Sequence, residues 1–466
     1  MLMLVKTAAW IAFVGLACAP GVRAQRGGLA AADVARYEAA VGAMRAGAPR
    51  QAAVELRALA RRYPANFAVA ESLGLAEGRT GDRAAAERWL KRAAALRPDL
   101  ALAHDNLGVA EMAAGHVPEA IEEFQAAVRA QPDDFEGWND LGQALAGRRE
   151  LRAAVAAWER AWRLRPTSAV GYNLALARHE LGEDAAAAAV LGSAPAFAAD
   201  AAAQSLWGDV EEGLGRYQAA IGHLQRAQAL APSEAHVFRL GLELLRHWTL
   251  PPARAVLEAG RRDYPASVRI GLALALTEYG VGASDEALPL LAQVLEQAPA
   301  QPGLLDFLGA VCAGTNAGTA ACGRLVTFAA AHPHNGAAAA YAAAVAIERI
   351  VRAGGAANTA ALAPAHALVQ RALALAPHLA EAHLQAGQLA AAEGRWPAAV
   401  RQLEYAHQLR PADDRIEFHL AQAYARNGQA ALAQAALARH QAALAREQHA
   451  FDERYAAIQA FVVQLK

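Results

Sequence analysis

Proline recurs along this chain at a nearly fixed interval, and this is the feature that most restricts its fold. Most steps in the series are 33 or 34 residues long, with one step of 66 and one of 44, at Pro64, Pro98, Pro132, Pro166, Pro232, Pro265, Pro299, Pro333, Pro377 and Pro411. A fixed period of this length indicates a repeat protein, in which each unit is one supersecondary element that stacks on its neighbours.

Other residue types keep step with the proline when it is numbered position 32 of a unit. Leucine recurs at position 7, glycine at position 8 and near position 15, alanine at position 20, and a large apolar residue at position 24. Small residues at positions 8 and 20 allow two antiparallel helices to approach closely. Glycine near position 15 ends the first helix, and proline ends the second. Each unit is therefore predicted to be a helix pair.

Composition agrees with an all-α fold and excludes several function classes. Apolar residues make up 55% of the 466 residues, much of that alanine, and aromatic residues only 6%, which favours helices over sheets. The 44 basic and 45 acidic residues leave no basic surface that would indicate binding to nucleic acid. No catalytic, nucleotide-binding or metal-binding motif is found, so the chain is predicted to be no enzyme and to need no cofactor.

Residues 138 to 166 carry the pattern in its fullest form, with Trp138, Leu141, Gly142, Ala154, Trp158, Ala161 and Pro166. In this stretch the chain resembles the tetratricopeptide repeat family. The resemblance implies a right-handed superhelical α-solenoid of about twelve helix-turn-helix repeats over residues 33–447. The units are expected to start near residues 33, 67, 101, 135, 168, 201, 234, 268, 302, 336, 380 and 414.

Three local departures from the pattern are interpreted as follows. Pro195 shortens the second helix of the fifth unit, and an insertion near 354–364 is expected to form a loop between the two helices of the tenth unit. Residues 448–466, with apolar residues at helical spacing, are expected to form a C-terminal capping helix.

The N-terminus has the pattern of an export signal. Lys6 precedes an apolar run from Ala8 to Ala19, and small residues end at Ala24, so residues 1–24 are interpreted as a cleaved signal peptide and 25–32 as a linker. The alternative is a lipoprotein signal with Cys18 as the acylated residue. The protein is therefore expected to be periplasmic or secreted, or alternatively an outer-membrane lipoprotein. No membrane span is expected in the mature chain.

Cys312 and Cys322 occupy positions 11 and 21 of the ninth unit, at equal distances from the turn between its two helices. Antiparallel helices would face the two side chains toward each other, so a disulfide is predicted. Two small buried thiols are the alternative.

The resemblance also implies a concave groove, lined by positions 2, 5, 9, 12 and 13 of the first helices, that binds extended peptides. The candidate groove residues are Tyr37, Asp105, Asn139, Gln143, Tyr172, Asp209, Phe238, Leu242, Tyr279 and Phe418. Many residues at these positions are apolar, and two interpretations stay open: an anchor surface for a partner, or packing between units.

The sequence thus favours a non-enzymatic protein-protein interaction scaffold of the cell envelope that binds extended or amphipathic partner segments. The alternative is an accessory subunit of an envelope polysaccharide-export or outer-membrane assembly machine. The sequence names neither the partner nor the oligomeric state.

Overall fold

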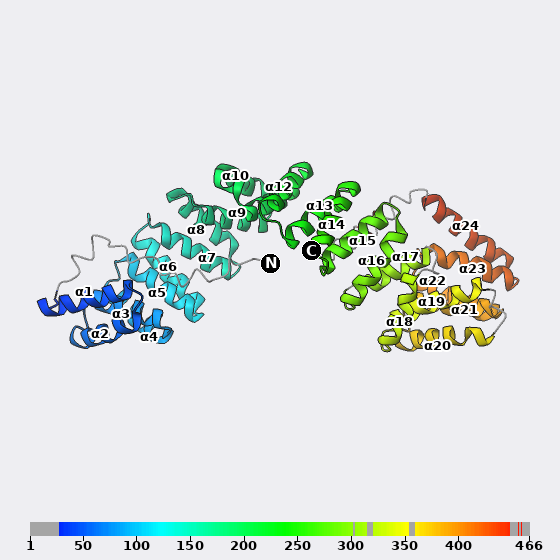
Figure 1. Ribbon diagram of the computed structural model, residues 1–466, viewed down its shortest axis with the longest axis horizontal. Helices are drawn as coiled ribbons and strands as arrows, with labels where there is room; N and C mark the ends of the chain where they lie inside the picture. Colours follow the sequence, from blue (N-terminus) through cyan, green and yellow to red (C-terminus); the bar gives the residue numbers. More distant parts are fainter. Residues whose placement is uncertain are drawn as a thin grey trace. The chain divides into compact units, whose positions relative to one another are not determined.

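The chain folds into helix pairs along its whole described length (Figure 1). The computed structural model describes residues 28–301, 303–314, 320–353 and 359–447, together with residues 455 and 458. Over these ranges there are twenty-four α-helices, one short 3-10 helix and no strand. None of the helices in these ranges combines the length and the apolarity needed to cross a bilayer.

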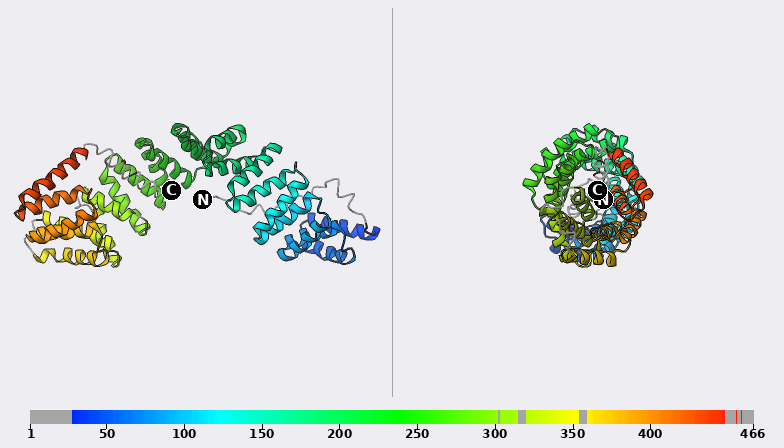
Figure 2. Two further views of the ribbon diagram at one scale, coloured as in Figure 1. Left: turned by 180° about the vertical axis from the view of Figure 1, so that it is seen from behind. Right: turned by 90° about the vertical axis from the view of Figure 1, so that its right-hand side faces the viewer.

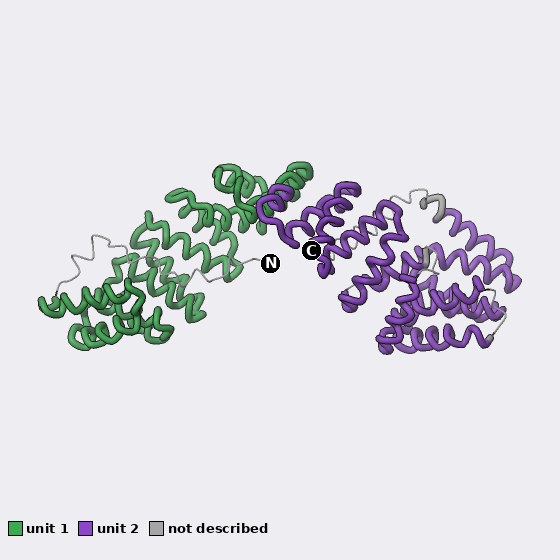
Figure 3. The backbone as a smooth tube through the Cα atoms, viewed as in Figure 1, with its two compact units in different colours: residues 1–223 green, residues 224–466 purple. Residues whose placement is uncertain are grey.

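Two compact units divide the chain, Met1–His223 and Leu224–Lys466 (Figure 3). Unit 1 contains the helices α1 (Ala31–Arg45), α2 (Pro49–Arg62), α3 (Phe67–Thr80), α4 (Arg83–Leu96), α5 (Ala101–Ala114), α6 (Val117–Ala130), α7 (Phe135–Gly147), α8 (Leu151–Leu164), α9 (Ser168–Glu180), α10 (Asp184–Ser193), η3 (Pro195–Ala199) and α11 (Ala201–Gly213). The division falls within α12 (Tyr217–Leu230).

Unit 2 continues with α13 (Glu234–Arg246), α14 (Leu250–Asp263), α15 (Val268–Gly280), α16 (Ser284–Gln297), α17 (Leu304–Gly314), α18 (Ala320–Ala331), α19 (Gly336–Arg352), α20 (Thr359–Leu375), α21 (Ala380–Ala392), α22 (Trp396–Leu409), α23 (Asp414–Arg426) and α24 (Ala430–Glu447). Within each unit the pairs stack side by side, each turned relative to the one before it (Figure 2). Odd-numbered helices are the first members of the pairs, and they begin where the repeat register predicts, except that α1 begins at residue 31 and α17 at residue 304.

Glycine ends the first helix in most pairs, as the register predicts. The residues Gly47, Gly81, Gly115, Gly182, Gly215, Gly282, Gly394 and Gly428 all have positive φ, in the left-handed region that closes an α-helix. Two pairs place a larger residue there, Arg149 with φ 64° and Trp248 with φ 56°.

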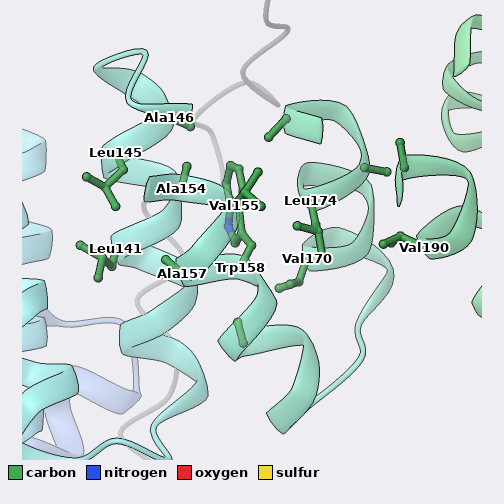
Figure 4. Close-up of a cluster of buried hydrophobic side chains, with 14 of the residues drawn as sticks. Leu141, Leu145, Ala146, Ala154, Val155, Ala157, Trp158, Val170, Leu174 and Val190 are labelled. Carbon is green, nitrogen blue, oxygen red and sulfur yellow. The ribbon is translucent and has the colours of Figure 1, made fainter. Parts of the chain in front are cut away.

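In several pairs, glycine at position 8 lets the two helices approach closely in the core. A Cβ at Gly142 would lie 2.6 Å from Nε1 of Trp158, and a Cβ at Gly108 would lie 2.7 Å from the Phe124 ring. Figure 4 shows Trp158 of α8 among Leu141 of α7 and Leu174 of α9, so this indole joins one pair to the next. The tryptophan-rich stretch is therefore packing, and Trp158 is only 3% exposed.

The C-terminal capping helix expected at residues 448–466 lies almost wholly outside the described residues and stays a prediction. Of the expected capping helix 448–466, only Tyr455 and Ile458 lie within the described residues. Ile458 approaches Gly280 of the eighth pair, and the Tyr455 ring meets the Trp248 ring of the seventh pair. The signal segment 1–24, with Cys18, lies outside the described residues, as does part of the linker 25–32.

The insertion of the tenth pair is only partly a loop. Residues 359–364 belong to α20, which includes Pro364, and both helices of this pair are 17 residues long. Alanine and leucine around Pro364 favour a longer helix, since they have high helix propensity. Residues 354–358 lie outside the described residues. In the fifth pair, α10 ends at Ser193 before Pro195, as predicted.

Candidate interaction surface

First helices of successive pairs in unit 1 pack directly on one another, α1 on α3, α3 on α5 and α5 on α7. We call these four helices the first-helix layer. Because the pairs repeat in register, a residue at position 5 of one first helix lies near position 6 of the next. This layer carries four of the predicted groove residues: Tyr37, Asp105, Asn139 and Gln143.

Hydrogen bonds between residues 35 apart connect neighbouring first helices. Tyr37 Oη and Ser72 Oγ lie 2.9 Å apart, and Asn106 Nδ2 donates to Glu71 Oε1 at 3.0 Å. In unit 2, Tyr341 Oη donates to Asp306 Oδ1 at 3.1 Å in the same register. Each bond joins position 5 of one pair to position 6 of the next, so these side chains fix the stacking of the repeats.

A cluster of carboxyl groups lies where α5 meets the start of α7. Asp134 caps α7, its Oδ1 accepting the backbone N–H of Glu136 at 3.2 Å. A Cβ at Gly137 would lie 3.1 Å from Asp105 Oδ1 and 3.2 Å from Asp134 Oδ2, so the glycine leaves room for both carboxyl groups. Asp105 Oδ1 is buried and accepts no N–H hydrogen bond from the described residues, and its hydrogen-bonding neighbour is the carboxyl group of Asp134. We call Asp105, Asp134, Glu136 and Asp140 the carboxyl cluster.

Two members of the carboxyl cluster, Asp105 and Asp140, have raised pKa values. Burial, followed by the hydrogen bond with Asp134 and by the charges of Asp134, Asp140 and Glu136, raises the pKa of Asp105 to about 9. A neutral Asp105 carboxyl can then share its proton with Asp134, which removes the repulsion between the two groups. Burial likewise raises the pKa of Asp140 to about 7, although Asn139 Nδ2 donates to Asp140 Oδ1 at 3.1 Å.

Glu71 of α3, in the preceding pair, is another buried carboxyl group with a raised pKa. Its burial raises the pKa to about 7, against the lowering effect of the Asn106 hydrogen bond. The first-helix layer thus presents carboxyl and amide groups on three consecutive helices, α3, α5 and α7. Such groups accept hydrogen bonds from N–H donors and attract cationic side chains, which would favour the charged carboxylates.

The predicted groove residues have different environments. Tyr37, Phe238 and Leu242 are only 5%, 4% and 7% exposed, which for these three favours packing between units over an anchor surface for a partner. The reason is that first helices pack on each other, α13 on α15 for example, and the Arg269 guanidinium also lies 4.9 Å from the Phe238 ring centroid.

The remaining predicted groove residues keep part of their surface exposed. Phe418 of α23 is exposed, and the half-buried ones are Asp105, Asn139, Gln143, Tyr172, Asp209 and Tyr279. The Tyr279 ring meets Phe307 edge to face at 5.2 Å, so this tyrosine contributes to packing between pairs of unit 2. Asp105 lies on α5, and Asn139 and Gln143 lie on the neighbouring first helix α7.

Ion pairs between consecutive repeats were not found by sequence reasoning. Arg57 of α2 forms two hydrogen bonds of 2.7 Å with buried Glu77 of α3, and Arg178 of α9 pairs with Glu159 of α8 at 2.5 Å with the charges reversed. Opposite charges at position 25 of one unit and position 11 of the next were the available signal. These ion pairs each join the second helix of one repeat to the first helix of the next, and so hold the repeats together.

The disulfide prediction is confirmed. Cys312 of α17 is bonded to Cys322 of α18, with their Cα atoms 5.8 Å apart, and both residues are buried. The disulfide joins the two helices of the ninth pair, which belongs to unit 2, whereas the first-helix layer belongs to unit 1.

Comparisons with known proteins give likenesses in structure only. No protein-family model matches the chain, and no curated protein matches it. Similar solved structures include a chain of the Naa15/Naa10 complex bound to HypK-THB, with 15% identity, 87% of this chain and 68% of that chain covered, and a TM-score of 0.42.

Two shorter structures resemble part of the array. PilF of Pseudomonas aeruginosa has 17% identity, covers 44% of this chain and 94% of its own, and has a TM-score of 0.37. YrrB, described as a TPR protein with an unusual peptide-binding site, has 15% identity, covers 47% and 96%, and has a TM-score of 0.30. Because these scores are below 0.5, the architecture is concluded from the chain's own helix pairs and repeat register.

Proposed function

Because the chain is an array of tetratricopeptide-type helix pairs, we propose that it is a non-enzymatic scaffold that binds an extended segment of a partner protein along the first-helix layer. The observation that carries the proposal is Asp105: its buried carboxyl group lies among three further carboxyl groups, and no cationic or N–H group of the described residues donates to its Oδ1. Carboxyl groups buried together without a cation near them are costly to ionise, and a cation that reaches them removes this cost.

The chemistry of the layer indicates what the partner segment offers. Its backbone N–H groups would donate to Asn139 and Gln143, which are half-buried on α7. A lysine or arginine of the segment would pair with Asp105 and Asp140, whose raised pKa values would fall as the cation arrives. The partner is therefore a basic, extended peptide segment.

We further propose that the scaffold works in the cell envelope. The N-terminal pattern of an export signal and the Cys312–Cys322 disulfide both support an oxidising compartment. Mass spectrometry of the mature N-terminus tests this proposal. A chain beginning at Gln25 would be free in the periplasm or secreted, a lipidated Cys18 would favour an outer-membrane assembly or export machine, and an intact Met1 would contradict both.

A photo-crosslinking amino acid at Gln143 tests the binding surface in the producing cells. The matched control carries the same group at Arg152, which is exposed on the second helix α8. Position 143 is expected to give an adduct with one partner, whose linked peptide contains basic residues, and position 152 to give none. Equal adducts at both positions, or none at position 143, would contradict the proposal.

A further inference from the structure

A shallow cavity of about 370 Å³ lies in unit 1 at the end of the second helix α8, against the turn between α6 and α7. It is lined by Pro132 and Asp133 of the turn and by Arg160, Arg163 and Leu164 of α8. All five residues are exposed, so the cavity is open along its rim. Its volume is at the small end of ligand sites, roughly 300–1,000 Å³, and fits a few side chains of a segment lying on the surface.

Arg160 lacks the contact that the equivalent arginine makes two repeats earlier. In the second pair, Arg92 donates from Nε to the carbonyl oxygen of Pro64 at 3.4 Å. In the fourth pair the corresponding carbonyl oxygen, of Pro132, accepts the indole N–H of Trp138 at 3.0 Å. The Arg160 guanidinium instead lies 5.7 Å from the Trp138 ring centroid. Among the described residues it donates no hydrogen bond and forms no ion pair.

Arg163, about one turn further along α8, has the same property. It is exposed, and no described residue accepts a hydrogen bond from it or pairs with its charge. Its neighbour Arg165 differs, because that guanidinium lies 3.6 Å from the Phe135 ring centroid and pairs with Glu136 at 2.5 Å. The cavity therefore presents two guanidinium groups whose N–H donors are open to a ligand, against the single carboxylate of Asp133.

The lining of the cavity indicates a ligand that combines a carboxylate with an apolar group. Guanidinium groups bind carboxylates in a planar, two-point geometry. Pro132 and Leu164 lie beside the two arginines, and Leu164 keeps 42% of its surface exposed. Covering that surface with an apolar side chain would stabilise a complex. In an extended segment, side chains two residues apart point to the same side, so a glutamate and a leucine at this spacing can reach the arginines and Leu164 together.

We propose that this cavity is a second interaction site, which binds an extended acidic segment of a partner protein through a carboxylate and an apolar side chain two residues apart. This site differs from the first-helix layer, because its charge is opposite and it lies on a second helix. The nearly neutral chain has no broad basic surface, so two arginines beside apolar side chains favour a peptide over a nucleic acid. Neither site depends on the other, and each can fail its test alone.

A synthetic peptide of serine residues with one glutamate and, two residues later, one leucine tests the site on the full chain. Ligand-observed NMR titration suits the weak binding of one short segment. The Kd of the peptide is expected to be at least tenfold higher for Arg160→Ala/Arg163→Ala than for the wild type. The matched control, Arg88→Ala/Arg152→Ala, removes two exposed arginines of unit 1 outside the cavity and should keep the wild-type Kd. Equal Kd values for all three chains, or no binding to the wild type, would overturn the proposal.

Changes in the peptide separate the two parts of the interaction. Glutamine in place of the glutamate, and serine in place of the leucine, should each raise the Kd for the wild type by about threefold or more. A glutamine peptide that binds as tightly as the glutamate peptide would overturn the role of the arginines. Self-association of the wild type that is lost in Arg160→Ala/Arg163→Ala would assign the cavity to a second copy of the chain and overturn the proposal of an acidic partner.

Arg160→Lys/Arg163→Lys separates the two-point geometry from charge alone. Lysine keeps both positive charges but lacks the planar fork of N–H donors, so the Kd for the glutamate peptide should lie between those of the wild type and the alanine variant. Circular dichroism should give the wild-type helix content for both double variants, because the two arginines are exposed. A lysine variant that binds no better than the alanine variant and no worse than the wild type would show that neither residue contacts the peptide, and would overturn the proposal.

Discussion

Replacing Gly142 by alanine should destabilise the fourth helix pair, although alanine is the better helix former. The new Cβ would lie 2.6, 2.7 and 2.8 Å from three atoms of the Trp158 indole, a rigid and buried ring that cannot turn aside. Overpacking of this kind costs about 1–3 kcal/mol, and the gain in helix propensity is about 1 kcal/mol. The expected net loss in the free energy of unfolding is therefore up to about 2 kcal/mol.

Gly147→Ala is the matched control on the same helix, because a Cβ at Gly147 would have no neighbour within 4 Å. Urea unfolding followed by circular dichroism, with amide exchange of α7 and α8, compares the two variants with the wild type. Gly142→Ala should lower the urea midpoint and make amide exchange faster. Gly147→Ala should change neither the midpoint downward nor the exchange rate upward. In a Trp158→Ala chain the same Gly142→Ala change should cost nothing. A Gly142→Ala chain as stable as Gly147→Ala would refute this account of the packing.

Three further predictions concern ion pairs, buried charge and the disulfide. Arg57→Glu should lower the free energy of unfolding by about 1–3 kcal/mol, since buried Glu77 loses its partner, and adding Glu77→Arg should restore most of it in urea unfolding. The pKa of about 9 for Asp105 exceeds that of an unfolded aspartate, about 4, so the folded state binds the proton more tightly and stability falls as pH rises between these values. Asp105→Asn should therefore raise thermal stability at pH 8 by about 1–3 kcal/mol and weaken its pH dependence; a lower melting temperature at pH 8 would count against the carboxyl cluster. Replacing Cys312 and Cys322 by serine opens a loop with a sequence separation of 10 and should cost about 3 kcal/mol, whereas wild-type unfolding that is insensitive to reductant would argue against this.

The repeat register could be predicted from the sequence because proline and glycine act locally. Pro98 ends a helix and Gly115 closes one whatever lies beyond the pair, so the helix boundaries follow from spacing. The close contact at position 8 could also be predicted, since no other residue has room beside Trp158 or Phe124.

The environment of the candidate site residues could be predicted only in part. Whether Tyr37 or Phe238 is open depends on how closely the next first helix packs, and residue type does not report that distance. The carboxyl cluster joins Asp105 to Asp134, 29 residues later, and the raised pKa of Asp105 comes from that approach and from burial. The contact between Ile458 and Gly280 could not be predicted, because it joins residues that are far apart in the sequence and no local sequence pattern indicates it.

The affinity of the crosslinked partner segment, as a synthetic peptide, tests the central claim most directly. Isothermal titration calorimetry would compare the wild type with Asn139→Ala/Gln143→Ala on the first-helix layer, and with Arg152→Ala/Arg163→Ala on the exposed side of α8. We predict at least a tenfold higher Kd for the first double variant, equivalent to about 1.4 kcal/mol, and the wild-type Kd for the second. Equal Kd values for all three proteins would contradict the proposal that the scaffold binds its partner along the first-helix layer.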